Sequence, residues 1–221
     1  NYNLLNSTTT SVADITPRFL VVTPTAVSKV YDSNTSAAIS ALSSNVIAGD
    51  TIGTLGSASA NFIDKNVGTG KLVTVNVIIT PAIDNTNYTI PATATTTANI
   101  TKRTLTVSAT GIDKVYDGNT GANVNFTDNR LAGDTFTIAS SSSSFNDKNV
   151  GTNKLVTILG LSLTGLDSGN YNVAPNSATT TANITAKSAT ITTYNNTKVY
   201  CTSHPALTAT TTGLVAPDTL S

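Results

Sequence analysis

The stretch FIDKNVGTGKLVT (62–74) decides the fold, because it returns almost unchanged as FNDKNVGTNKLVT at 145–157. Other segments return at a similar interval: KVYD (29–32) at 114–117, AGDT (48–51) at 132–135, and ATTTANIT (94–101) at 178–185. The copies lie 83 to 85 residues apart. An interval of that length indicates tandem copies of one domain-sized unit.

The repeats predict how the chain is divided. We expect a tail of a preceding repeat at 1–16, full repeats at 17–101 and 102–186, and the first part of a third repeat at 187–221. The opening Asn1-Tyr2 corresponds to Asn87-Tyr88 of the first repeat. At the other end KVYC (198–201) and PDT (217–219) stand where KVYD and GDT stood. We therefore expect this chain to be a piece of a longer protein.

Composition excludes several classes of protein. All twelve acids are Asp, and Glu, Gln, Met and Trp are absent, so strong helix formers are scarce. Thr makes up roughly a fifth of the residues, which favours strands. The net charge is zero, so nothing electrostatic favours nucleic acid as a partner. Apolar runs are too short for a membrane helix, and we expect no membrane insertion.

Alternating patterns predict half-buried strands that open and close each repeat. The apolar residues expected to point inward are Leu20 and Val22, Leu105 and Val107, Ala189 and Ile191, Ala98 and Ile100, and Ala182 and Ile184. In the middle strand of the first repeat, Val73 and Val75 share a face. The second copy changes face near Gly160, which indicates either a bulge or a strand buried on both sides.

Turn residues separate these strands. The DKNVG segments predict a positive φ at Asn66 and Asn149 and at Gly68 and Gly151. Asp117-Gly118 is compatible with a tight hairpin turn, but Ser33 replaces that glycine in the first copy. A loop in which the aspartate carboxylate accepts from nearby backbone N–H groups fits both copies better. We predict an all-β fold of tandem, antiparallel β-sandwich repeats.

Few side chains in this chain could perform chemistry. His204 is the only histidine and Cys201 the only cysteine, so neither a zinc site nor a disulfide can form within the chain. We expect no enzyme, no cofactor and no metal site. The candidate ligands for calcium are Asp50, Asp134, Asp84 and Asp167, but a lone Asp beside Gly usually forms a turn. The repeated Lys29, Lys114, Lys65 and Lys148 are expected over tyrosine rings or paired with aspartates.

The recurring motifs resemble the YDG repeat family, named for the Tyr-Asp-Gly found here at 116–118. The positions that carry the resemblance are Lys29, Tyr31, Asp32, Asp64, Lys114, Tyr116, Asp117 and Asp147. Ser33 departs from the motif at its glycine, and the third unit looks more like the related MBG modules. The resemblance implies immunoglobulin-like sandwiches in bacterial surface and secreted proteins, among them adhesins, with no catalytic motif.

These observations predict a structural stalk or spacer in a large extracellular protein at a bacterial cell surface. The expected partners are neighbouring repeats of the same chain, with any glycan or protein ligand bound by parts outside this piece. The alternative is a binding module whose loops contact a glycan, a host protein or neighbouring filament subunits.

Overall fold

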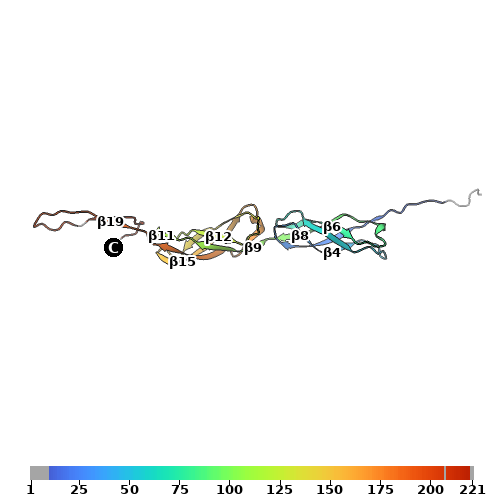
Figure 1. The fold of residues 1–221 in the computed structure, drawn as a ribbon, viewed down its shortest axis with the longest axis horizontal. Helices are drawn as coiled ribbons and strands as arrows, with labels where there is room; N and C mark the ends of the chain where they lie inside the picture. The colour runs from blue at the N-terminus through green and yellow to red at the C-terminus, as the bar shows by residue number, and fades with distance from the viewer. Residues whose placement is uncertain (1–9, 207, 220–221) are drawn as a thin grey trace, which may run out of the picture. The chain divides into compact units, whose positions relative to one another are not determined.

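The structure is a computed structural model that describes residues 10–206 and 208–219. The chain forms two compact units that divide between Arg103 and Thr104, and Figure 1 labels some of their strands. The described residues contain strands and two single-turn 3-10 helices, η1 (Asn85–Asn87) and η2 (Ser168–Asn170), and no α-helix. None of these described segments is a helix long and apolar enough to cross a membrane. The predicted all-β class is confirmed.

The first unit is built from a four-stranded sheet and two strand pairs. Its strands are β1 (Arg18–Phe19), β2 (Val22–Val27), β3 (Lys29–Val30), β4 (Ala38–Ser44), β5 (Leu55–Phe62), β6 (Gly68–Ile79), β7 (Tyr88–Thr89) and β8 (Thr93–Thr101). The four-stranded sheet has the order β3-β8-β6-β5, β2 pairs with β4, and β1 pairs with β7. The neighbours β6 and β8 run antiparallel (Figure 1).

The second unit repeats this plan. Its strands are β9 (Arg103–Leu105), β10 (Val107–Gly111), β11 (Lys114–Val115), β12 (Val124–Asp128), β13 (Thr137–Ala139), β14 (Ser142–Phe145), β15 (Gly151–Leu159), β16 (Ser162–Thr164), β17 (Tyr171–Val173), β18 (Ser177–Thr185), β19 (Thr190–Thr193) and β20 (Ala209–Thr212). The four-stranded sheet has the order β11-β18-β15-β14, and β10 pairs with β12.

The sequence predicted antiparallel strand pairs, but some pairs in the structure are parallel. The short strands β3 and β11 join β8 and β18 in parallel, and β1 joins β7 in the same way. A parallel pair needs a long crossover between its strands. Here the rest of the repeat supplies that crossover, because the chain builds the intervening strands before it returns beside β3 or β11.

Each repeat has its own core of buried apolar residues. In the first, Leu20, Val73, Val75 and Ile100 are almost completely buried. In the second, the buried residues Phe145, Val156, Ile158, Leu161, Ala182 and Ile184 pack against Val107, Val124 and Phe126 of the β10–β12 pair. The inward positions predicted for the opening and closing strands of both full repeats are therefore confirmed.

The change of face near Gly160 is a break in the strand. Gly160 has φ +64° and separates β15 from β16. The side chain of Leu159 is half exposed, while Ile158 and Leu161 are buried. The strand is thus not buried on both sides; the glycine returns the chain to the inward face at Leu161.

The predicted left-handed positions in the DKNVG turns are wrong by two residues or more. The positive φ falls at Gly70 (+59°) and at Asn153 (+51°). Both residues sit where the register with the closing strand shifts, a β-bulge. Their backbone N–H groups donate to the side-chain oxygens of Asn99 and Asn183, each at 2.8 Å. The asparagine of the closing strand thus fixes the bulge and the place of the left-handed residue.

The segment after residue 187 differs from the prediction. It forms the hairpin β19–β20, and both Ala189 and Ile191, expected to point inward, are exposed. Burial would require a second sheet against this hairpin, and residues 188–206 and 208–219 form only the one pair of strands. Of the tail expected at 1–16, residues 1–9 lie outside the described residues, and 10–16 contain no strand.

Candidate functional site

The Tyr-Asp-Gly motif of the second repeat opens a loop, residues 116–121, which we call the signature loop. This loop is organised around the amino group of Lys114. Its Nζ lies 2.8 Å from Asp117 Oδ1, 2.8 Å from the Asn119 carbonyl oxygen, 3.1 Å from Asn119 Oδ1 and 2.9 Å from the Gly121 carbonyl oxygen. The ring of Phe145 lies beneath it, 5.5 Å from Nζ to the ring centroid. The lysine side chain is only 17% exposed. One ammonium group therefore holds four oxygens of a single loop, as a bound cation would.

The first repeat builds the same arrangement. Lys29 Nζ contacts Asp32 Oδ1 at 2.7 Å, the Asn34 carbonyl oxygen at 2.9 Å, Asn34 Oδ1 at 3.0 Å and the Ser36 carbonyl oxygen at 2.9 Å. Phe62 replaces Phe145 beneath the lysine. The expectation that these lysines pair with aspartates is confirmed.

The aspartate of each signature stabilises its loop in two ways. Asp117 Oδ1 also accepts from the Asn119 N–H at 3.1 Å, and Asp32 Oδ1 from the Asn34 N–H at 3.2 Å. This is the carboxylate-stabilised loop predicted from the sequence, and the hairpin alternative is excluded. Hydrogen bonds from Lys114 and the Asn119 N–H hold the pKa of Asp117 below its usual range. At Asp32 burial raises the pKa, but the bonds from Lys29 and Asn34 outweigh it.

The DKNVG loop holds a second ion pair in each repeat. Lys71 contacts Asp64 at 2.7 Å and Lys154 contacts Asp147 at 2.5 Å, with both lysine side chains nearly buried. The lysine bonds, with backbone N–H donors two residues beyond each aspartate, lower the pKa of both carboxyl groups. Sequence reasoning selected the aspartates but missed Lys71 and Lys154, although KLVT repeats in both copies.

The other two repeated lysines lie over the signature tyrosines, as expected. Lys65 Nζ is 5.8 Å from the Tyr31 ring centroid, and Lys148 Nζ is 6.0 Å from that of Tyr116. Within the second unit, the hydroxyl of Tyr116 donates to Asp218 Oδ2 at 2.7 Å, and Lys148 lies 3.8 Å from Asp218 Oδ1. Tyr116, followed by Asp218, raises the pKa of Lys148. The second repeat and the segment after it thus meet at a polar contact.

The four calcium candidates all hold loops together. Asp50 accepts from the Tyr88 hydroxyl and Asp134 from the Tyr171 hydroxyl, both at 2.6 Å. The carboxylates of Asp84 and Asp167 accept from the backbone N–H groups of Thr51 and Thr135 at 2.7 and 2.9 Å. Over 10–206 and 208–219, no three His, Cys or Asp side chains gather into a metal-binding group. The role of the two tyrosines was missed, because each bond joins residues that lie 38 or 37 positions apart in the sequence.

His204 and Cys201 lie outside the strands, in the segment that joins β19 to β20. His204 Nε2 is 3.5 Å from Lys198 Nζ, and Cys201 is exposed and unpaired. Among the residues that the structure describes, His204 contacts a lysine and Cys201 has no partner, so the two do not form a nucleophile–base pair.

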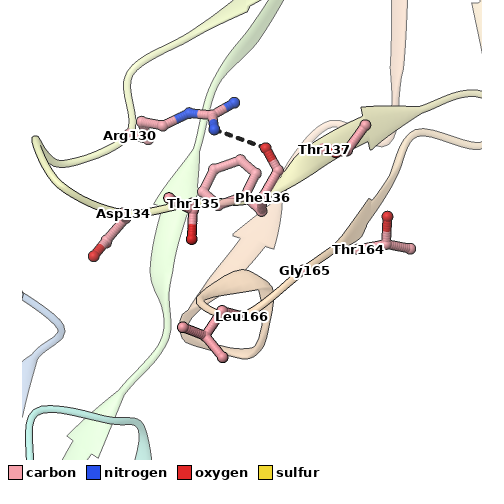
Figure 2. A pocket seen from close by; sticks show the side chains of 8 residues that line it. All are labelled: Arg130, Asp134, Thr135, Phe136, Thr137, Thr164, Gly165 and Leu166. Carbon is pink, nitrogen blue, oxygen red and sulfur yellow. Dashed lines mark hydrogen bonds between the residues drawn. The ribbon is translucent and has the colours of Figure 1, made fainter.

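A hollow of about 390 Å³ opens at one end of the second repeat (Figure 2). Its lining residues are Arg130, Asp134, Thr135, Phe136, Thr137, Thr164, Gly165 and Leu166. The Arg130 guanidinium lies 3.8 Å from the centroid of the Phe136 ring, and its Nη1 donates to the Phe136 carbonyl oxygen at 2.7 Å. Asp128, bonded to the same guanidinium, raises the pKa of Arg130. The arginine is therefore held in place and its charge is paired.

Acidification is expected to destabilise both repeats. The folded pKa values of Asp64, Asp117 and Asp147 are depressed, so the stability they contribute is complete above the unfolded value of 3.8 and disappears as pH falls through the folded values. Thermal unfolding followed by circular dichroism should give a nearly constant Tm from pH 7 to about 5 and a falling Tm below about 4. An Asp147→Asn variant should show a shallower fall; a Tm that rises on acidification would contradict the assignment.

The fold and these loops define a class of protein: small β modules in tandem, whose charged side chains form ion pairs within their own loops. The model of the YDG domain family matches residues 16–98 and again 101–182. The chain therefore belongs to the YDG domain family. No curated protein and no solved structure matches it.

Proposed function

We propose that these repeats are non-catalytic structural spacers in a large, extracellular, adhesin-like protein of a bacterial cell surface. The observation that carries the proposal is the contact between the second repeat and the segment that follows it, where Tyr116 binds Asp218. A spacer needs domains that fold separately and joints that tie one to the next. Separate cores and a polar joint meet both needs.

The use of charge supports a spacer role as well. Lys29, Lys114, Lys71 and Lys154 each bind an aspartate of their own repeat, and the aspartates also accept from backbone N–H groups. Catalysis requires groups that remain available to a substrate. The repeated ionic groups instead stabilise loops, which serves a module that must persist outside the cell.

One observation favours the alternative, a binding module. The hollow beside Arg130 presents the hydroxyls of Thr135, Thr137 and Thr164 and the exposed Leu166. In the first repeat Val46 occupies the position of Arg130, so this feature belongs to one copy only. Residues that differ between otherwise matched repeats are where ligand specificity would reside.

Replacing one repeat with an unrelated domain distinguishes the spacer function from the binding function. In the protein as its cells make it, residues 104–186 are replaced by an unrelated β-sandwich of similar length. A spacer role predicts that cell attachment is retained and that antibodies against the remaining repeat still label intact cells. An Arg130→Ala variant is the matched test of the hollow. Loss of attachment in both variants would establish the binding module instead, and absence of labelling would refute the surface location.

A further inference from the structure

We propose that the Tyr-Asp-Gly signature of the second repeat is a docking surface, and that its partner is the aspartate-bearing loop of the module that follows. This inference rests on the proposed spacer function and gives the signature a role in joining modules. Asp117 faces its own loop through Lys114, whereas Tyr116 reaches out of the repeat to Asp218. The two residues of one motif therefore serve two different contacts.

The polar part of the surface consists of a donor and a neighbouring cation. The Tyr116 hydroxyl binds one carboxylate oxygen of Asp218, and Lys148 lies near the other. The loop that carries the aspartate is itself closed, because the Asp218 N–H donates to the Val215 carbonyl oxygen at 2.7 Å. A hydrogen bond to an ionised partner is stronger than one between neutral groups. The geometry thus selects a carboxylate in a preformed turn.

The glycine of the signature makes room for the partner. Gly118 has φ +80°, and a Cβ at that position would lie 2.8 Å from Val215 Cγ1. Ser33 occupies the same place in the first repeat with φ +63°, so the left-handed conformation alone does not demand glycine. Close approach of Val215 is therefore the specific reason for Gly118.

The acceptor position has the same chemistry elsewhere in the chain. Asp218 aligns with Asp50 and Asp134, and each of those accepts a tyrosine hydroxyl at 2.6 Å. The donor to Asp50 is Tyr88 and the donor to Asp134 is Tyr171, so each of these bonds lies within one repeat. At Asp218 the donor is a tyrosine of the preceding repeat. The docking thus uses an aspartate position that already binds tyrosine within the fold.

A double-mutant cycle tests the proposal in the full chain. Tyr116→Phe and Asp218→Ala each remove the hydroxyl–carboxylate bond, and amide hydrogen exchange reports on the hairpin β19–β20. Each single variant should raise the exchange rate of hairpin amides about tenfold, which corresponds to one hydrogen bond to a charged group. The double variant should be no faster than the single ones, because both remove the same contact.

Matched controls make the result specific. Tyr88→Phe and Asp50→Ala remove the equivalent bond in the first repeat and should leave hairpin exchange unchanged. Core amides of β15 should keep their protection in Tyr116→Phe, which shows that the second repeat remains folded. Unchanged hairpin exchange in the single variants, or effects that multiply in the double variant, would overturn the docking role. The spacer function would still be tested separately, by the replacement of residues 104–186 with an unrelated domain.

Discussion

Replacing Ile158 by Ala should lower the free energy of unfolding of the second repeat by about 3 kcal/mol and leave the first repeat unaffected. Ile158 is completely buried in a core formed only by residues of its own repeat. Truncation removes apolar burial and leaves a cavity that the surrounding sheets fill only in part. Hydrogen exchange with mass spectrometry measures each repeat separately, through peptides from 68–79 and 151–159.

The control for this prediction is the adjacent residue. Leu159→Ala removes a side chain of similar size that is half exposed, and should cost much less. Val75→Ala, at the corresponding position of the first repeat, should give the reciprocal pattern. If Ile158→Ala loosened both repeats together, the two would share one cooperative core, and the description of independent modules would be wrong.

Replacing Lys114 by Met should open the signature loop and destabilise the second repeat by about 2 kcal/mol. Methionine retains most of the apolar stem over Phe145, but it leaves the carbonyl oxygens of Asn119 and Gly121 without their cationic donor. Because the loop also carries Tyr116, amides of the hairpin β19–β20 should exchange faster as well. Thermal unfolding and hydrogen exchange measure the two effects.

Lys102→Met is the matched control, because Lys102 is exposed at the junction that follows β8. It should change neither stability nor hairpin exchange. Lys29→Met should reproduce the loss of stability in the first repeat without affecting the hairpin. A Lys114→Met variant as stable as the parent would show that the loop is held by its backbone turns alone.

Much of the fold could be predicted because burial follows a period of two along each strand. The alternation of Leu20 with Phe19 and of Ile100 with Asn99 sufficed to orient the opening and closing strands. The same pattern misled at Ala189 and Ile191, since alternation predicts which face is apolar and not whether another sheet covers it. The parallel pairing of β3 and β11 was missed because strand order depends on how the whole chain returns.

The site was predictable only where its contacts are local. Asp117 and Lys114 lie three residues apart, so an ion pair between them was one of the two alternatives that the sequence offered for this lysine. The bonds from Tyr88 to Asp50 and from Tyr171 to Asp134 join distant parts of the chain and require the topology. A positive φ was predicted at Gly68 but is found at Gly70. The sequence could not show this, because Asn99 on another strand determines where the bulge lies.

The position of Lys29 and Lys114 inside their own loops affects how those loops respond to the surrounding solution. Many secreted modules rely on dissolved ions to keep their loops in shape, so their order rises and falls with the surrounding medium. Lys29 and Lys114 bring their own positive charge, tethered by the side chain and held over an aromatic ring. The local concentration of that charge is set when the polypeptide is synthesised, and dilution of the environment cannot remove it.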